Sequence, residues 1–418
     1  MRFATYRLGD PAQAGRSERF AAPDTSWARF GDQVVVHGTD EQWSGVAERA
    51  QRSGVRLREL PAPVDRDHLH LVVQNGRLFQ QEHPEARVLV DAGRYLLVDL
   101  DPKRARTIGG GKGSVPCYAV RPVEDELVAF EVRERAAARA APVPWVQSLV
   151  DRVSLKTFKA DLTRLVEIPT RFSTSTHYAK ASTAARKQLA GLGYTARRRS
   201  ISVAGGVSQN VIADKPGGGS GARGLVLVTA HLDSINSSGG PAARAPGADD
   251  NGSGSAGVLE IARALEDHRG VHNLRFVLFG GEEEGLHGSR QYVASLTATD
   301  RARIRAVVNM DMIGTLNTPQ RSVLLEGAAV SQAVIDGLAE AAATYTGLSV
   351  QTSLHAANSD HVPFITAGLA AVLTIEGADH TNGNIHSDRD TLDHIDDELA
   401  LEILRMNTAF VASALGRP

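Results

Sequence analysis

The sequence predicts an α/β fold in which a mixed, mostly parallel sheet is sandwiched between helices, preceded by a smaller α+β domain. Strand candidates such as 225–229 and 276–279 are apolar on both faces, which is typical of a sheet covered by helices on both sides. Strand and helix candidates alternate along the second part of the chain, and an Ala/Pro linker at 140–144 separates it from the first. We therefore expect domains at residues 1–140 and 141–418.

The first domain begins with a polar stretch, residues 1–24, that we expect to be a loosely structured lead-in. A helix is predicted at 41–53 because its apolar residues recur at helical spacing. Short apolar runs bounded by turn residues predict strands at 34–36, 55–60, 69–73, 86–90, 95–100 and 127–132.

The second domain carries longer helical patterns. Helices are predicted at 146–166 (one or two), 178–192, 255–267, 289–298, 331–346 and 396–415. Strands are predicted at 197–203, 210–214, 225–229, 274–279, 306–310, 323–326 and 370–375. Because functional sites in such sheets form beyond the carboxyl ends of the strands, polar residues just after these strands become the candidates for function.

Composition excludes several classes of protein. A net charge of −2 gives no electrostatic preference for nucleic acid or for an anionic membrane. Cys117 is the only cysteine, so an intramolecular disulfide framework and a cysteine-based zinc site are both excluded. No apolar run reaches the roughly 20 residues that span a bilayer, and residues 1–15 lack the apolar core of a signal peptide. We expect a soluble protein, with its compartment and oligomeric state left open.

Acidic and imidazole residues follow successive strands of the second domain. They are His231, Asp249, one or more of Glu282 to Glu284, and Asp311, and His386 lies in a polar loop later in the chain. Asp249 lies in a run that also suits a capped helix start, and three glutamates in a row are usually solvent-facing. Taken together, however, two histidines and three carboxylates without sulfur favour zinc, with Mn²⁺ or Co²⁺ as alternatives. Five ligands suit two ions that share a bridging carboxylate, for which Asp249 is the candidate.

The sequence also contains residues that would orient a metal ligand or move protons beside the metal. Asp233, two residues after His231, is placed to accept the N–H of the imidazole nitrogen that does not bind metal. Neighbouring glutamates could divide their roles, one binding metal and one moving protons.

Six segments in the second domain then resemble, in order and spacing, the co-catalytic zinc aminopeptidases of the bacterial leucyl-aminopeptidase type. These segments are Ala230–Ser234, Pro246–Gly254, Glu282–Ser289, Asn309–Met312, Ser359–His361, and Ile385-His386 followed by Asp390–Leu392. The resemblance covers about residues 146–416 and does not extend to residues 1–140.

This resemblance implies a metal-dependent aminopeptidase that binds two Zn²⁺ and removes N-terminal residues from peptides with a free N-terminus. It implies that Asp249 bridges the metals and is joined to Asp250 by a cis peptide bond. It implies further that Glu282 is the general base and Asp233 the partner of His231. The remaining metal ligands implied by the resemblance are His231, Glu283, Asp311 and His386.

The chain departs from the family pattern at the residue that stabilises the tetrahedral intermediate of peptide hydrolysis, in which the carbonyl oxygen becomes an oxyanion. Members often carry a tyrosine shortly before the Ser-Asp-His segment, whereas this chain has His355-Ala356-Ala357-Asn358 there. His355 is a candidate replacement donor, and otherwise the metals carry the oxyanion alone. For Ser359 and Asp360 a structural role is expected, because adjacent residues do not form a serine-hydrolase relay easily.

Other functions stay open at this stage. Relatives of this core include carboxypeptidases and glutaminyl cyclases, and a non-catalytic peptide-binding module is a further alternative. The first domain fits a propeptide-like cover, a gating domain or an interaction surface equally well. Side-chain specificity is not predicted.

Overall fold

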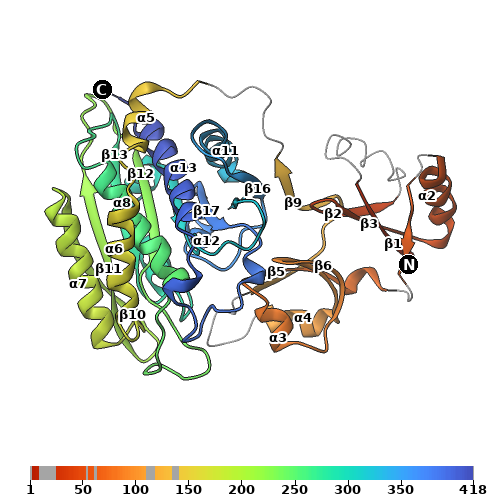
Figure 1. Cartoon of the computed structure of the whole chain (residues 1–418). Coiled ribbons are helices and arrows are strands. Elements are labelled where there is room, and N and C mark those ends of the chain that lie inside the picture. The colour runs from red at the N-terminus through yellow and green to blue at the C-terminus, as the bar shows by residue number, and fades with distance from the viewer. Residues whose placement is uncertain are drawn as a thin grey trace. The chain divides into compact units, whose positions relative to one another are not determined.

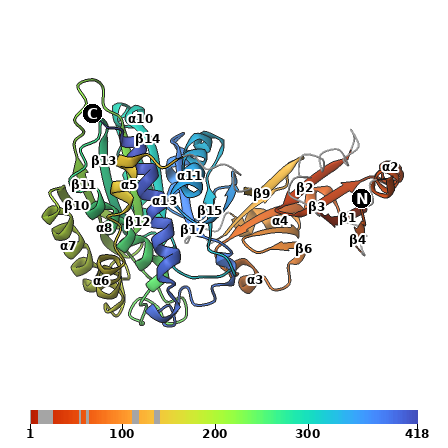
Figure 2. The same cartoon turned by 45° about the horizontal axis from the view of Figure 1, so that its top comes forward.

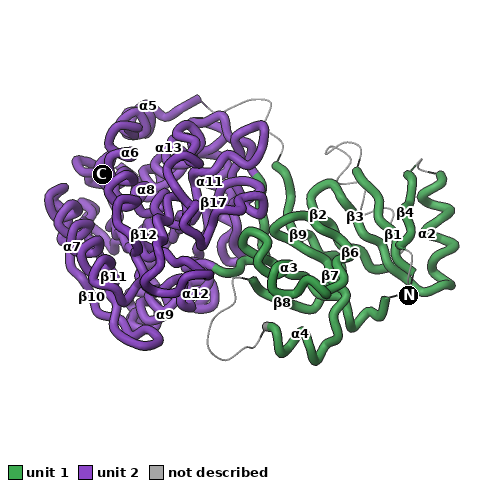
Figure 3. The backbone as a smooth tube through the Cα atoms, turned by 60° about the horizontal axis from the view of Figure 1, so that its bottom comes forward, with its two compact units in different colours: residues 1–134, 351–358 green, residues 135–350, 359–418 purple. Residues whose placement is uncertain are grey.

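The computed structural model describes residues 2–8, 25–52, 55–60, 64–109, 118–133 and 141–417. It divides into two compact units (Figure 3). Residues 1–134 and 351–358 form the first unit, and residues 135–350 and 359–418 form the second. The division therefore falls near the expected boundary at residue 140, but the first unit also includes a short segment from late in the chain.

The second unit is built on a mixed sheet, as predicted. Its strands lie in the order β10 (Thr195–Val203), β11 (Gly206–Lys215), β13 (Asn273–Phe279), β12 (Leu225–His231), β14 (Ile304–Met310), β17 (Ala371–Glu376), β15 (Ser322–Glu326). The central pairs β13–β12, β12–β14 and β14–β17 are parallel. The pairs β10–β11, β11–β13 and β15–β17 are antiparallel.

Helices cover both faces of this sheet because its central strands are apolar on both sides. On β12, Val226, Val228 and Ala230 belong to one buried core, while Leu225 and Leu227 belong to another. The larger core packs against α5 (Pro144–Val150), α6 (Leu155–Val166), α7 (Thr176–Gly191), α8 (Gly254–Ala264), α11 (Gln332–Tyr345) and α13 (Asp397–Leu415) (Figures 1 and 2). The smaller core packs against α9 (His287–Ala294) and α12 (His361–Thr366), and α10 (Ala298–Arg303) precedes β14.

The topology brings the candidate residues to one edge of the sheet. His231 is the last residue of β12, Glu282 and Glu283 follow β13, and Asp311 follows β14. Because these three strands are parallel neighbours, their carboxyl ends lie side by side.

The first unit contains two sheets. One has the order β9 (Leu127–Arg133), β2 (Ser26–Phe30), β3 (Gln33–Gly38), β1 (Arg2–Arg7), β4 (Arg58–Glu59), and carries α2 (Asp40–Arg52). The other has the order β6 (Arg87–Ala92), β7 (Tyr95–Asp99), β5 (Leu69–Gln74), β8 (Tyr118–Pro122), with α3 (Leu78–Glu82) and α4 (Pro102–Gly109). The expected loose lead-in is wrong at residues 2–7, which pair with β3, and most of its remainder lies outside the described residues.

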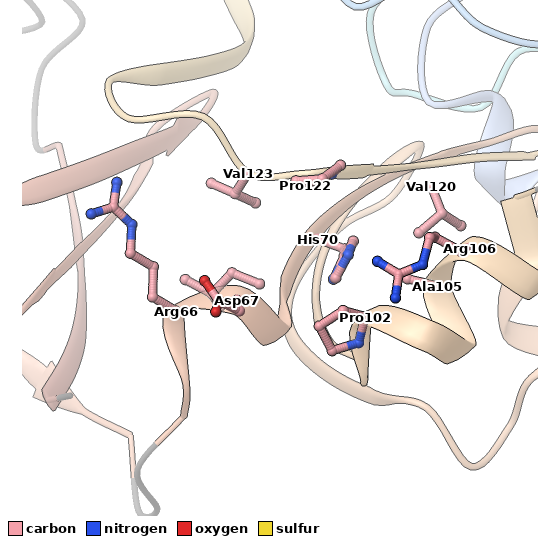
Figure 4. A pocket seen from close by; sticks show the side chains of 10 residues that line it. Arg66, Asp67, His70, Pro102, Ala105, Arg106, Val120, Pro122 and Val123 are labelled. Carbon is pink, nitrogen blue, oxygen red and sulfur yellow. The ribbon is translucent and has the colours of Figure 1, made fainter.

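A cavity of about 610 Å³ lies in the first unit, beside β5, β8 and α4 (Figure 4). Arg66 lies on one side of it, and His70 and Arg106 lie on the other. Its lining contains none of the acidic residues predicted to bind metal. In the part of the chain that is described, no helix combines the length and the apolarity needed to cross a bilayer.

Candidate metal centre

Two histidines approach one carboxylate from different sides. The Nε2 atom of His231 lies 3.2 Å from Oδ1 of Asp250, and Nε2 of His386 lies 3.0 Å from Oδ2 of the same residue. His231 Nε2 also lies 3.3 Å from Asp311 Oδ1, and His386 Nε2 lies 2.9 Å from Glu283 Oε2. Asp250 therefore contacts both histidines, and each histidine also contacts a second carboxylate.

The potential ligand atoms gather in two overlapping groups. One group joins His231, Asp250 and Glu283, and the other joins His231, Glu282 and Asp311; within each, the atoms lie within 4.8 Å of one another. Four of the five residues predicted to bind metal therefore lie together, namely His231, Glu283, Asp311 and His386, and Glu282 lies beside them.

The structure corrects the prediction at Asp249. Its carboxylate lies outside the cluster and accepts hydrogen bonds from Gly314 N at 2.9 Å, Thr315 Oγ1 at 2.6 Å and Asn382 Nδ2 at 2.8 Å. These donors come from loops far away in the sequence, and they leave Asp250 to face the histidines. The predicted cis bond between Asp249 and Asp250 is wrong as well, since the cis peptide joins Asp250 to Asn251.

Two buried side chains that the sequence did not single out hold the turn that carries Asp250. The Asp390 carboxylate accepts hydrogen bonds from the backbone N–H of Asp249 at 2.9 Å and of Asp250 at 3.0 Å. Arg171 donates to the carbonyl oxygens of Leu232 and Gly247, each at 2.8 Å. In the sequence, Asp390 was marked only by its place in the Asp390–Leu392 segment. No sequence pattern pointed to Arg171.

Arg171 donates to two further carbonyl oxygens, those of Leu165 at 3.1 Å and of Pro246 at 2.5 Å, and it is fully buried. Burial lowers the pKa of its guanidinium to about 10, while Asp390 and Asp233 act in the opposite direction. A pKa of that size keeps the side chain positively charged at neutral pH. It therefore supplies a buried cation next to a cluster of carboxylates.

We expect Arg171→Met to destabilise the second unit strongly, because four buried carbonyl groups and several carboxylates would lose their cationic partner. The free energy of unfolding should fall by about 3 to 5 kcal/mol. Urea titration followed by circular dichroism measures this change. Lys159→Ala, which removes a largely exposed ion pair to Asp397, is the matched control and should change stability by less than about 1 kcal/mol. Equal effects of the two substitutions would contradict the role of Arg171.

Asp233 and Ser359 contact the predicted ligands. His231 Nδ1 lies 3.2 Å from the carbonyl oxygen of Asp233 and 3.7 Å from its Oδ1, so the closer partner is the backbone. Asp233 Oδ2 accepts a hydrogen bond from Glu283 N at 3.2 Å. Ser359 Oγ donates to Asp311 Oδ2 at 2.7 Å and accepts from Asn309 Nδ2 at 2.9 Å. These contacts orient His231, Glu283 and Asp311.

Asp360 and His355 have different surroundings. Asp360 is fully buried near the cluster, and burial raises the pKa of its carboxyl to about 7. The Nε2 atom of His355 lies 3.0 Å from the carbonyl oxygen of Val128, and both residues belong to the first unit. The structure thus gives His355 a contact with strand β9 and no support for the predicted role as an oxyanion donor.

Burial dominates the electrostatics of the cluster. Burial raises the pKa of Glu282 well above its ordinary value, and burial together with Asp250 raises that of Glu283 to about 7. Burial alone would lower the pKa of His231, but Asp311 and Glu282 outweigh it and raise that pKa well above normal. Protons are therefore retained here because carboxylates outnumber the cations available to balance them.

This arrangement fits a divalent cation. The donors are imidazole nitrogens and carboxylate oxygens, the set that zinc and related ions accept. Glu283 Oε1 and Asp233 Oδ1 are buried without a hydrogen-bond partner, and such atoms are costly unless a cation or proton satisfies them. Glu282, Glu283 and His231, whose pKa values are raised, would release protons when a metal binds.

Comparison with known proteins agrees with the site. Residues 210–411 match Peptidase family M28. The chain is 31% identical over 278 residues to Leupeptin-inactivating enzyme 1 of Streptomyces exfoliatus, a match that covers 64% of this chain and 58% of that protein. It is 32% identical over 211 residues to Aminopeptidase YwaD of Bacillus subtilis, covering 50% of this chain and 45% of the relative. The chain thus spans about half the length of the curated relatives it matches.

Among solved structures, BSAP, a zinc aminopeptidase from Bacillus subtilis, superposes with a TM-score of 0.55 at 19% identity, covering 63% of this chain and 96% of that one. At this identity the likeness shows the fold alone. The resemblance to the co-catalytic aminopeptidases is confirmed by the match of residues 210–411 to Peptidase family M28 and by the similarity to aminopeptidase relatives.

Proposed function

We propose that this chain is a metal-dependent aminopeptidase that hydrolyses the first peptide bond of substrates with a free N-terminus. The observation that carries the proposal is the position of Asp250, whose two carboxylate oxygens face two different histidines. A carboxylate shared in this way is what a pair of metal ions requires. The names of the relatives, Aminopeptidase YwaD and a zinc aminopeptidase, support the reaction and the metal.

Two sets of residues would hold the ions. His231 and Asp311 would complete one set and Glu283 and His386 the other, with Asp250 common to both. When bound, two Zn²⁺ ions, or Mn²⁺ or Co²⁺ in their place, lower the pKa of water and polarise a carbonyl group. Ser359, through Asp311, and Asp233, through His231 and Glu283, would keep these side chains in position.

Glu282 is the proposed general base. It lies in the same group of atoms as His231 and Asp311 and is buried, which raises the pKa of its carboxyl well above normal. A carboxylate with a raised pKa accepts a proton from the attacking water more readily than an exposed one, and it can return that proton to the leaving amine. One side chain then serves as base in the first half of the reaction and as acid in the second.

The proposal is tested with the full chain, dialysed against zinc and assayed on a panel of aminoacyl-anilides together with their N-acetylated forms. We expect cleavage of the free substrates only. A chelator should abolish turnover, and added Zn²⁺, Mn²⁺ or Co²⁺ should restore it. Equal cleavage of acetylated and free substrates would refute the aminopeptidase proposal.

The same assay separates the rival functions. A carboxypeptidase would require a free carboxyl terminus, and a glutaminyl cyclase would convert N-terminal glutamine without releasing an amino acid. A non-catalytic peptide-binding module would turn over none of the substrates in the presence of zinc.

A further inference from the structure

The cavity of the first unit lies beside the face of the four-stranded sheet that α4 covers (Figure 4). Val72 of β5 packs in the same core cluster as Ala105 of α4, which identifies that face. His70 lies two residues before Val72 and is paired with Pro122 of β8, so both side chains lie on the same face. Every residue of the cavity lining belongs to the first unit.

Much of the cavity wall is apolar and only half-buried. Val120, Val123 and Pro102 line the cavity and are each partly exposed to solvent. Leu69 and Ala105, which also contribute to the lining, are buried. An apolar body that covered this wall would remove it from water, which is favourable in proportion to the apolar area covered.

Two oppositely charged side chains of the lining, Asp67 and Arg106, form no hydrogen bond or ion pair with any residue that the structure describes. The third charged side chain, Arg66, is already paired with Asp125. Figure 4 shows Asp67 on the Arg66 side of the cavity and Arg106 on the opposite side, close to His70. The cavity therefore presents one unpaired negative charge and one unpaired positive charge, and they are separated from each other.

His70 adds a polar group on the Arg106 side. It is buried, and its Nδ1 atom lies 2.9 Å from the carbonyl oxygen of His68. Because a carbonyl oxygen only accepts, Nδ1 is the donor and carries the proton. In the neutral ring Nε2 is then a hydrogen-bond acceptor, and no described residue donates to it.

We propose that this cavity binds a small zwitterion whose ammonium and carboxylate groups are separated by an apolar body, such as a short apolar peptide with both termini free. The ammonium group pairs with Asp67 and the carboxylate with Arg106, while the apolar body covers Val120 and Val123. An anion alone would leave Asp67 without a counter-charge, and a cation alone would leave Arg106 without one. This site lies in the first unit alone and does not depend on the proposed peptidase activity.

The probe is ω-aminohexanoate, a linear zwitterion that contains no peptide bond and therefore is not consumed by a peptidase. It is titrated into the full chain, and its dissociation constant is measured by calorimetry. Its N-acetylated form keeps only the carboxylate, and hexylamine keeps only the ammonium group. Each of these should bind at least about fivefold more weakly, because one ion pair is lost. L-Leucine, which carries both charges on the same carbon atom, should also bind more weakly than the probe.

Hydrogen exchange locates the bound probe within the chain. The backbone N–H of Val123 donates to the carbonyl oxygen of Leu69 at 3.0 Å, and both residues line the cavity. At a probe concentration of about ten times its dissociation constant, exchange of the Val123 amide should be about tenfold slower. The amides of β12, in the second unit, are the internal reference and should exchange at an unchanged rate.

Arg106→Ala and Asp67→Asn test the two charges separately, and each should weaken binding of the probe by about fivefold. Arg104→Ala is the matched control. It removes the same charge from the same helix, but Arg104 pairs with Glu85 and does not line the cavity. Its affinity for the probe should equal that of the unsubstituted chain.

The outcomes that would overturn the proposal are specific. Failure of the probe to bind, or binding without slower exchange at Val123, would show that the cavity does not hold a zwitterion. Equal affinity for the probe and its N-acetylated form would indicate an anion site instead. Equal affinity for L-leucine would refute the separation of the two charges, and an unchanged affinity in Arg106→Ala would refute the assigned carboxylate partner.

Discussion

Glu282→Gln is expected to lower kcat by about three orders of magnitude while the metal content stays at the level of the unsubstituted chain. The amide has the shape of the carboxyl but cannot accept a proton from the attacking water. The metal should remain, because the two histidines, Asp250, Glu283 and Asp311 are unchanged. Steady-state kinetics on a leucyl-anilide, combined with elemental analysis of the purified protein, measures both quantities.

Glu284→Gln provides the control, since it makes the same change two residues away at a carboxyl outside both groups of potential ligand atoms. Its kcat should stay within a few-fold of the original, because Glu284 belongs to neither group of potential ligand atoms. Near-normal turnover in Glu282→Gln would rule out Glu282 as the general base.

Asp250→Asn is expected to empty the metal centre, whereas Asp249→Asn is not. The two carboxylate oxygens of Asp250 each pair with one of the two histidines, so its loss should weaken both sites and lower kcat by at least about a thousandfold. Asp249 instead accepts hydrogen bonds from Gly314, Thr315 and Asn382. Its substitution should cost about 1 to 3 kcal/mol of stability through the loss of a buried acceptor.

Metal content after dialysis and thermal unfolding of both variants distinguish these outcomes. The expected pattern is low metal with Asp250→Asn, and retained metal with a lowered melting temperature for Asp249→Asn. The reverse pattern would restore Asp249 as the shared ligand and would show that the turn at 248–253 is arranged differently.

The parts of this fold that were predictable from sequence follow from local patterns. Val226, Val228 and Ala230 alternate with Leu225 and Leu227 on β12, so a strand that is apolar on both faces was visible without any distant contact. The carboxyl ends of neighbouring parallel strands lie at the same edge of a sheet. The sequence therefore also predicts that the histidines and carboxylates following these strands gather at that edge.

The remaining features depend on contacts between residues far apart in sequence. Asp249 and Asp250 are adjacent and chemically identical, and which of them faces the histidines is decided by Asn382 and Thr315, which bind the other. Arg171 is a single arginine in a loop, and its role arises only because four carbonyl groups from other segments converge on it. Residues 351–358 belong to the first unit for the same kind of reason, and no periodic pattern marks them.

The discontinuity of the first unit also constrains how the protein can fold during its synthesis. Arg94 and its acceptor Ala357 are 263 residues apart, so the unit that begins the chain receives its last piece only after most of the second unit has been translated. At bacterial and eukaryotic elongation rates of about 5–20 residues per second, that interval is roughly 15 to 50 seconds. The first unit therefore cannot be completed before synthesis of the second has begun, and the second is completed later still, because residues 359–418 follow.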